Sequence, residues 1–257
     1  VCILGFGTIG FIDDYSKVFK KSAEGLHARF KFIGQTLLAF GIVTFLYFNS
    51  NPETTLLYIP FIKFPVLDLS LFYIPFGVVI IVGFSNAVNL TDGLDGLASG
   101  LLIIVGMTFA ILAYLTGRAD YSAYLQVPFL ENAGELTVLC FSLIGSVVGF
   151  LWFNAHPAEI MLGDTGSLSL GGIIGVIALM LKKEILLIII GGVFVLEALS
   201  VIIQVVSFKL RGKRVFKMAP LHHHFELKGW AESKVVMRLW ILGGLFAIVS
   251  LSTLKIQ

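Results

Sequence analysis

Residues 71–98 read LFYIPFGVVIIVGFSNAVNLTDGLDGLA, and this stretch decides the fold class. Residues 71–89 are mostly apolar, and a helix of about 20 such residues crosses the roughly 30 Å hydrocarbon core of a bilayer. Comparable runs recur along the 257 residues, of which 57% are hydrophobic and 13% charged, whereas roughly a quarter are charged in soluble domains. The short alternating segments of a β-barrel are not found. We therefore expect an all-α polytopic membrane protein.

About eight apolar segments can be drawn in the chain, which we expect to form one integral membrane domain over residues 1–257. The first segment begins at Val1 rather than Met and ends at Ile12, too short to span, so N-terminal spans and part of this helix are expected to be missing. The sixth is short and rich in Gly, which predicts a half-helix or dependence on its neighbours. The segments are about 1–12, 32–49, 71–89, 97–116, 136–155, 168–181, 185–207 and 235–254.

The distribution of Lys and Arg predicts the orientation of the chain. Strict alternation of the spans places twelve cations on one side, which is therefore expected to be cytoplasmic, and five on the other. Five aspartates fall on the cytoplasmic side. Of the external loops, 50–70 is predicted to form a small hairpin on the membrane surface, and 117–135 suggests no chemistry. The cytoplasmic set comprises Lys17, Lys20, Lys21, Arg29, Lys31, Lys209, Arg211, Lys213, Arg214, Lys217, Lys228 and Lys234, with Asp13, Asp14, Asp92, Asp95 and Asp164; the external cations are Lys63, Arg118, Lys182, Lys183 and Lys255.

Residues 10–17, GFIDDYSK, place two adjacent carboxylates at the end of a membrane helix. Such carboxylates repel each other unless a cation or a base lies near. On a helix Asp13 and Asp14 point about 100° apart, so one can face a metal ion while the other pairs with Lys17. A solvated helix end is an equally good interpretation of this motif taken alone.

Residues 86–98, NAVNLTDGLDGLA, carry the second motif. Asn89, Asp92 and Asp95 recur every third residue, so they share one side if the chain is helical there. Gly93 and Gly96 allow the backbone to approach a ligand closely. A polar turn in which Asp92 caps the next helix is the alternative, but the number of acids, amides and glycines favours a binding site.

Residues 150–167, FLWFNAHPAEIMLGDTGS, carry the third motif. Asp164 lies among glycines and hydroxyl side chains, a setting that suits a hydrated Mg²⁺ bridging phosphates, because Mg²⁺ keeps several waters and takes few protein ligands. Asn154 and His156 end the preceding span. The alternative is that Asp164 only caps the sixth segment; we favour the functional interpretation.

Residues 218–230, MAPLHHHFELKGW, carry the fourth motif. Consecutive histidines rarely aim at one metal ion, so His222–His224 are expected to donate to phosphate oxygens or to handle protons near neutral pH. The basic stretch 209–217 is expected to hold anionic lipid headgroups. Within the seventh span, Glu197 is interpreted as a buried structural acid, while Gln204, nearer the cytoplasmic end, could reach a ligand.

Together and in this order, the four motifs resemble those of the polyprenyl-phosphate N-acetylhexosamine-1-phosphate transferases. The run APLHHHFELKGW at residues 219–230 is similar to the muramoyl branch, the phospho-N-acetylmuramoyl-pentapeptide transferases (translocase I). The resemblance covers essentially the whole chain. It implies the third to tenth of ten spans, around a cleft on the cytoplasmic face of the bacterial inner membrane.

The resemblance also implies an activity: transfer of phospho-MurNAc-pentapeptide from UDP-MurNAc-pentapeptide to undecaprenyl phosphate, giving lipid I and UMP for peptidoglycan synthesis, with Mg²⁺ required. It implies that Asp164 is the metal ligand and that Asp13 and Asp14 position the lipid phosphate. Membrane lipids are further expected partners, nucleic acid is not, and a homodimer is left open. The implied substrate-binding residues are Asn89, Asp92, Asp95, Asn154, Gln204, His223 and His224, and the implied catalytic residues are Asp13, Asp14, Asp164 and His223.

The lipid phosphate hardly needs deprotonating, since the second pKa of such a phosphate is about 6. Positioning and charge neutralisation are therefore expected to dominate, with direct attack on the sugar-bearing phosphorus. A phosphoryl-enzyme formed on an aspartate is the competing route. A transferase for UDP-N-acetylglucosamine and an ion-coupled transporter remain as alternatives, although transporters place polar groups near the midplane and many have internal repeats, of which we find none.

Overall fold

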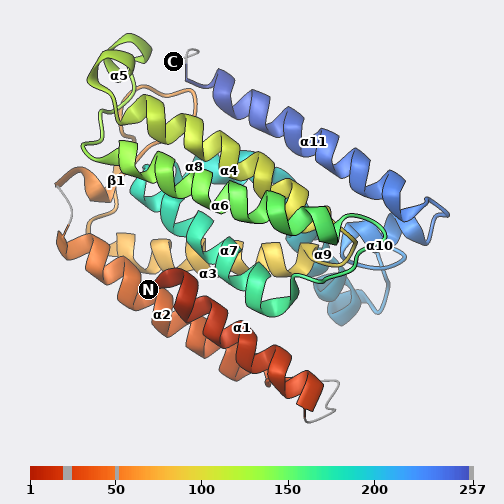
Figure 1. Ribbon diagram of the computed structural model, residues 1–257. Helices are drawn as coiled ribbons and strands as arrows, with labels where there is room; N and C mark the ends of the chain where they lie inside the picture. The colour runs from red at the N-terminus through yellow and green to blue at the C-terminus, as the bar shows by residue number, and fades with distance from the viewer. Residues whose placement is uncertain (20–24, 50–51, 255–257) are drawn as a thin grey trace.

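A computed structural model describes residues 1–19, 25–49 and 52–254, and these form a helical bundle (Figure 1). Seven helices in this part of the chain are long and apolar enough to cross a membrane, which confirms the expected all-α polytopic fold. They are α2 (Ala28–Asn49), α3 (Tyr73–Thr91), α4 (Leu97–Thr116), α6 (Ala133–Asn154), α7 (Gly163–Met180), α9 (Gly192–Arg211) and α11 (Glu232–Ser252). The remaining elements are α1 (Cys2–Phe19), α5 (Ala119–Leu125), α8 (Glu184–Ile190), α10 (Leu221–Glu226), η1 (Pro52–Thr55), η2 (Ser70–Phe72), β1 (Leu56–Leu57) and β2 (Leu67–Asp68).

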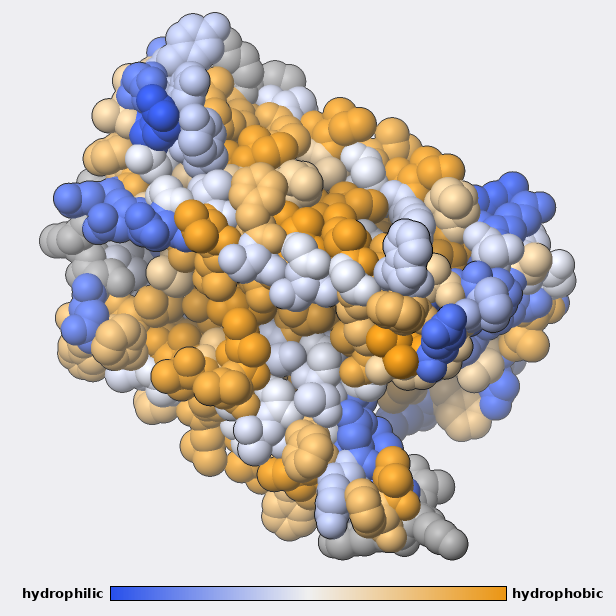
Figure 2. Space-filling view, in the orientation of Figure 1, coloured by the Kyte–Doolittle hydropathy of each residue, from blue (hydrophilic) through white to orange (hydrophobic). Residues whose placement is uncertain are grey.

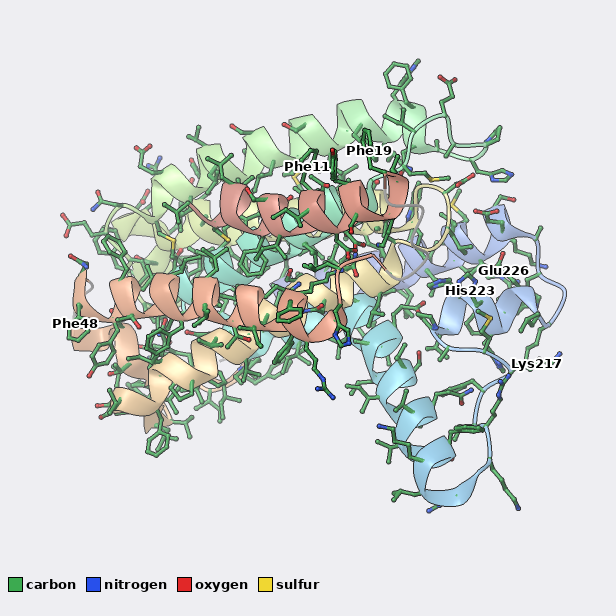
Figure 3. All side chains as sticks on the ribbon, turned by 90° about the horizontal axis from the view of Figure 1, so that it is seen from below. Phe11, Phe19, Phe48, Lys217, His223 and Glu226 are labelled. Carbon is green, nitrogen blue, oxygen red and sulfur yellow. The ribbon has the colours of Figure 1, made fainter. Side chains whose placement is uncertain are left out.

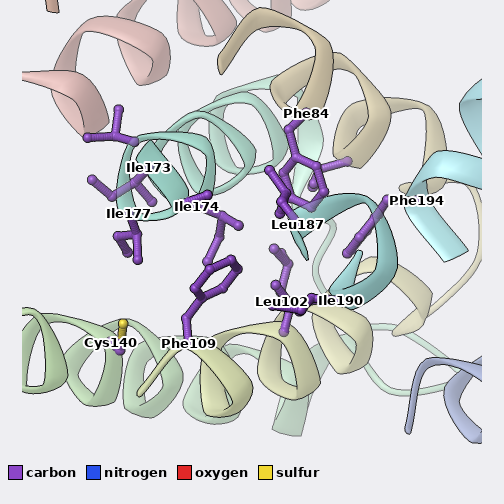
Figure 4. Packing of buried hydrophobic residues seen from close by; sticks show 14 of the residues in the cluster. Phe84, Leu102, Phe109, Cys140, Ile173, Ile174, Ile177, Leu187, Ile190 and Phe194 are labelled. Atoms are coloured by element: carbon purple, nitrogen blue, oxygen red, sulfur yellow. The ribbon is translucent and has the colours of Figure 1, made fainter. Parts of the chain in front are cut away.

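The centre of the bundle is formed by α4 and α7. Of their apolar spans 72% and 67% are buried within the protein, against 17% for α2 and 22% for α6 and α9. Across this core Phe109 of α4 points toward Ile174 of α7, and Leu102 of α4 lies beside Leu187 and Ile190 of α8 (Figure 4). The outer helices expose their remaining apolar side chains, as expected of helices that face lipid.

Polar groups gather at the two ends of the bundle, while hydrophobic residues cover much of the sides (Figure 2). The end that carries α10 also carries the α6–α7 connection, and the opposite end carries α5, β1 and the C terminus (Figure 1). We call the first the basic end, defined by residues 25–31, 92–96, 155–162 and 212–231. Lys20, Lys21 and Lys255, three of the cations used to predict orientation, lie outside the described residues.

The first and sixth segments differ from their expected bounds. α1 continues to Phe19, so Asp13 and Asp14 lie within the helix rather than at its end. The continuation is compatible with their charges because Lys17, one turn later, lies 2.6 Å from Asp13. α7 begins at Gly163 and is a full helix of 18 residues, so the half-helix expected for the sixth segment is wrong. The other expectation, dependence on neighbouring helices, agrees with the 67% burial of its apolar span.

The seventh segment, expected as one span over 185–207, is broken at Gly191 into α8 and α9. Two aromatic rings pack where side chains would otherwise stand: a Cβ on Gly191 would lie 2.4 Å from Phe84, and one on Gly192 would lie 2.7 Å from Phe246. Beyond this break, α9 leaves the bundle (Figure 3). At the opposite end, β1 and β2 pair antiparallel, which confirms a small hairpin within residues 50–70.

Candidate active site at the basic end

Three of the five predicted aspartates meet where α1 crosses the start of α7. Asp13, Asp14 and Asp164 each offer a carboxylate oxygen, and these oxygens lie within 4.8 Å of one another. The helices approach closely because α1 has Gly10 there, where a Cβ would lie 2.3 Å from the backbone oxygen of Asp164. A hard divalent cation such as Mg²⁺ prefers oxygen donors of this kind, so the three residues could hold one.

Two lysines neutralise part of this charge. Lys31 lies 2.6 Å from Asp164 Oδ2 and 3.6 Å from Asp13, while Lys17 lies 3.0 Å from Asp164 Oδ2 and 2.6 Å from Asp13. Three carboxylates and two ammonium groups leave one net negative charge. A bound divalent cation would compete with the lysines for Asp164 Oδ2, and the freed ammonium groups would remain beside it as phosphate-binding groups.

Asn89 of α3 fixes the other oxygen of Asp164. Its amide nitrogen donates to Asp164 Oδ1 at 2.6 Å and to the hydroxyl of Ser167 at 2.9 Å. The predicted second and third motifs therefore meet at this point. Because Asn89 occupies Oδ1, a metal ion would approach Asp164 at Oδ2, the oxygen that Lys17 and Lys31 contact in this structure.

Asp14 holds the first turn of α7. Its carboxylate accepts hydrogen bonds from the backbone nitrogens of Asp164 at 3.3 Å and Thr165 at 2.9 Å, and from the Thr165 hydroxyl at 2.7 Å. Gly163, which precedes them, has φ +65°, a conformation that side chains rarely adopt. The carboxylate of Asp14, which belongs to another helix, thus accepts from the first backbone N–H groups of α7 as an N-cap side chain would.

Asp92 follows the end of α3 and faces the same cluster. Burial raises the pKa of its carboxyl to about 6; a hydrogen bond from the Gly163 backbone opposes this shift, and the charges of Asp164 and Asp14 add to it. Asp92 is therefore more readily protonated near neutral pH than an ordinary aspartate.

Asp95, predicted to act with Asp92, contacts different partners. Its Oδ2 lies 3.1 Å from His156 Nδ1 and accepts the backbone N–H of Ala158 at 3.0 Å. Its own backbone nitrogen donates to Glu232 of α11 at 2.9 Å. Asp95, His156 and Glu232 form a second group of potential metal ligands, and they join the α3–α4, α6–α7 and α10–α11 connections.

Asn154 and Gln204 have their amides engaged with nearby loops. Asn154 accepts from Ser99 at 2.7 Å and donates to the backbone of Ile160 at 2.9 Å. Gln204 donates to the carbonyl of Phe216 and accepts from the Val215 and Phe216 backbone, all within 3.0 Å. In this state the two side chains fix the connections beside the cluster, and their predicted substrate contacts stay predictions.

His222 of α10 is buried against the second motif. A Cβ on Gly93 would lie 2.4 Å from its Nε2, so the absence of a side chain there makes room for the ring. Its Nδ1 lies 3.3 Å from Glu197 Oε2, and its backbone nitrogen donates to the same carboxylate at 3.4 Å. The expectation that Glu197 is buried is confirmed, and its contact links α9 to α10.

His223 and His224 are only partly buried and have different partners. His223 Nδ1 lies 2.7 Å from the carboxylate of Glu226. His224 Nδ1 accepts the backbone N–H of Lys217 at 3.0 Å. His223 and Glu226 lie side by side, with Lys217 on the segment that leads to them (Figure 3).

An apolar groove of about 830 Å³ lies between α2, α3 and α9. Its length follows α3 from Pro75 to Leu90, which is one residue from Asn89 of the cluster. The lining residues are Phe32, Thr36, Leu37, Phe40, Pro75, Val78, Val79, Val82, Gly83, Asn86, Ala87, Leu90, Ala198, Val201 and Ile202. The groove thus lies on the apolar side of the bundle, and two of its lining residues, Leu90 and Phe32, are next in sequence to Asn89 and Lys31 of the cluster.

Residues 1–182 match the family model described as glycosyl transferase family 4. The chain belongs to glycosyl transferase family 4. It is similar to curated phospho-N-acetylmuramoyl-pentapeptide-transferases. That of Thermodesulfovibrio yellowstonii is 54% identical over 259 residues, which cover 100% of this chain and 72% of the relative. Those of Borreliella burgdorferi and Pelagibacter ubique are each 55% identical, over 99% of this chain and 73% and 71% of the relative.

Sequence reasoning missed three side chains that make these contacts at the basic end. Lys31 was counted only as a loop cation, and Glu232 only as part of the last connection before α11. Glu226 stood within the fourth motif without a role, although its position three residues after His223 was a usable signal, since such residues are neighbours on a helix.

Proposed function

We propose that the chain transfers phospho-MurNAc-pentapeptide from UDP-MurNAc-pentapeptide to undecaprenyl phosphate, releasing UMP and forming lipid I for peptidoglycan synthesis. The observation that carries the proposal is sequence identity above 50%, over essentially the whole chain, to curated phospho-N-acetylmuramoyl-pentapeptide-transferases. The polar cluster at the basic end supports it, because a membrane-embedded lipid phosphate and a soluble nucleotide meet at an interface. A transporter would be expected to gather its polar groups near the midplane.

Mg²⁺ is the metal that we propose for the site, with Asp164 as its ligand through Oδ2 and with Asp13 and Asp14 close enough to complete an oxygen set. Hydrated Mg²⁺ typically takes one or two carboxylates together with substrate phosphates. When bound, it would supply the positive charge that neutralises a diphosphate. Direct metal binding can be measured without turnover, by the paramagnetic signal of Mn²⁺ added to the protein. Asp164→Asn should lose that binding, and unchanged binding would refute the assignment.

Positioning by the chain's own residues would supply most of the catalysis. Lys17 and Lys31 converge from α1 and α2 on the oxygen that we assign to the metal, so they would hold the phosphates of both substrates. Asn89 keeps Asp164 oriented, and Asp14 keeps the start of α7 in place. The lipid phosphate needs no base to become a nucleophile, so we favour direct attack on the sugar-bearing phosphorus over an aspartyl phosphoryl-enzyme.

The prenyl chain of the acceptor would lie in the groove between α2, α3 and α9. The groove is lined almost entirely by apolar side chains, and Leu90 at one end of α3 adjoins Asn89. A lipid lying there would carry its phosphate toward Lys31, which is next to Phe32 of the groove. By the loop cation bias, we place this end at the cytoplasmic face of the bacterial inner membrane.

The test is UMP release by the purified full-length protein in detergent with Mg²⁺, undecaprenyl phosphate and UDP-MurNAc-pentapeptide. We expect release that depends on all three and is lost in Asp164→Asn. Release with UDP-N-acetylglucosamine instead would favour the related transferases. No release with either nucleotide sugar would overturn the proposal. Retention of labelled phosphate on the protein with nucleotide sugar alone would favour the covalent route.

A further inference from the structure

Three consecutive histidines have their Nδ1 atoms facing three different partners. His222 is fully buried beside Glu197, whereas His223 and His224 face the carboxylate of Glu226 and the backbone nitrogen of Lys217. Which nitrogen of an imidazole carries the proton is set by the hydrogen bond that the other nitrogen makes. The two partly buried rings can therefore be assigned from their partners.

His224 must leave its Nδ1 unprotonated. The Lys217 backbone N–H is a donor with no lone pair to offer, so the nitrogen 3.0 Å away from it accepts. The ring proton is then on Nε2, which becomes a donor. The pKa of His224 is also lowered, by desolvation first and then by the charges of Lys228 and Lys217, which favours the neutral ring.

His223 has the opposite arrangement. An ionised carboxylate only accepts, so Nδ1 of His223 carries the proton that bridges the 2.7 Å to Glu226. When this ring is neutral, Nε2 is an acceptor. Two adjacent residues thus present one donor and one acceptor.

The scaffold around these rings is well braced. The rings of Phe225 and Trp230 stack with centroids 4.8 Å apart, and the backbone nitrogen of Trp230 donates to the carbonyl of Phe225 at 3.2 Å. The ammonium group of Lys217 donates to the carbonyl of Leu227 at 2.8 Å. Glu226, between these contacts, is held where it can orient the ring of His223.

We propose that Glu226 is a positioning residue that gives His223 the tautomer opposite to that of His224. The proposal deepens the proposed function and rests on it for the substrate. The Nε2–H of His224 would donate to a phosphate oxygen of the nucleotide sugar. The Nε2 of His223 would accept from an O–H or N–H of the sugar-peptide part.

The tautomers can be observed directly by solid-state NMR of ¹⁵N-histidine-labelled protein in proteoliposomes, since the chain has only five histidines. Loss of signals in His223→Asn and His224→Asn assigns the two rings. At a pH where both rings are neutral, we expect protonated Nδ1 for His223 and protonated Nε2 for His224. In Glu226→Ala, His223 should change to protonated Nε2, and Glu226→Asp should restore the original tautomer at least in part. Glu131→Ala, an acid at the opposite end, is the matched control and should change neither ring.

Kinetics supply a second readout. Glu226→Ala should lower kcat for UMP release by about tenfold or more, the loss expected when one strong hydrogen bond to substrate is misdirected. KM for the lipid acceptor should stay within about twofold of wild type, and Glu226→Asp should recover part of kcat. Protonated Nε2 on His223 in the wild type, or no change in Glu226→Ala, would overturn the assignment. Absence of UMP release by the wild type would instead refute the proposed function and leave the NMR result standing.

Discussion

The carboxylate of Asp14 accepts hydrogen bonds from both the backbone nitrogen of Thr165, at 2.9 Å, and its hydroxyl, at 2.7 Å. A residue of α1 therefore completes the first turn of α7, 151 positions later in the chain. This contact makes the position of Asp164 depend on the packing of two helices. The geometry of the centre and the stability of the bundle are consequently linked.

Asp14→Ala should destabilise the protein, because the first N–H groups of α7 lose their acceptor. We expect a loss of about 1–2 kcal/mol, the usual effect of removing a cap, seen as a lower midpoint of thermal unfolding in detergent. Asp14→Asn keeps one acceptor oxygen, so its midpoint of thermal unfolding should fall between those of the wild type and of Asp14→Ala. Asp120→Ala, an exposed acid at the opposite end, serves as control. An alanine variant as stable as wild type would contradict the capping role.

Gly10→Ala should separate α1 from α7. Its Cβ would lie 2.3 Å from a backbone oxygen, which cannot move as a flexible side chain would. Overpacking of this kind costs about 1–3 kcal/mol, and UMP release should fall with it because Asp164 is displaced. Gly145→Ala, where nothing lies within 4 Å, is the matched control and should be neutral. Equal activity and stability of the two variants would show that the contact is unimportant.

Lys31→Gln should lower kcat while lowering the Mg²⁺ concentration needed for half-maximal activity. The first effect follows from the loss of a phosphate-binding group, which we expect to cost about tenfold or more. The second follows because the Lys31 ammonium group competes with a cation for Asp164 Oδ2, 2.6 Å away. Lys63→Gln, at the opposite end, should leave both quantities unchanged. A higher Mg²⁺ requirement in Lys31→Gln would contradict the competition.

The stability of the protein should fall as pH rises through about 6, because burial raises the pKa of Asp92 to that value. The contribution of neutral Asp92 to stability is fully present below the ordinary aspartate pKa near 4, and it is lost as the pH rises through the folded-state pKa. Asp92→Asn should therefore be more stable than wild type by about 2 kcal/mol at pH 8 and equal to it near pH 4. Thermal unfolding at several pH values measures the difference. A constant difference across that range would rule out titration of Asp92 as the cause, and Asp120→Asn should show no gain at pH 8.

Gly83→Leu should fill the groove without disturbing the helices, because nothing lies within 4 Å of a Cβ at that position. We expect KM for undecaprenyl phosphate to rise by about tenfold, the effect of losing contact area worth one or two methylene groups. KM for the nucleotide sugar should not change. Gly145→Leu, on the lipid-facing side of α6, introduces the same side chain elsewhere. The groove assignment fails if both variants, or neither, raise KM for the lipid.

The membrane spans and the gathering of acids at one end could be predicted because both follow from local sequence. Apolar runs fix the spans, and strict alternation places the ends that carry Asp13, Asn89 and Asp164 on the same side. Alternation says nothing about which of these ends touch. That depends on close packing at positions such as Gly10, whose effect is visible only in three dimensions.

The expected pairing of Asp92 with Asp95 assumed that the chain stays helical through the motif. α3 ends at Thr91, and Gly96 has φ +74°, so the backbone turns between these two residues. The carboxylates of Asp92 and Asp95 therefore reach different partners. Lys31 was undervalued for another reason. It lies 133 residues from Asp164 in sequence, and a basic loop at a membrane surface already accounts for a lysine without any contact.

The groove between α2, α3 and α9 is open along its length, since Leu37 and Val79 in its wall are 66% and 67% exposed. If the groove holds the polyprenyl chain of the acceptor, as we propose, that chain can enter from the side, between helices, without leaving its leaflet, and the lipid-linked product can leave the same way. Encounter with the acceptor becomes a search in two dimensions. In proteoliposomes, turnover should accordingly follow the mole fraction of acceptor in the bilayer and be indifferent to dilution of the vesicles.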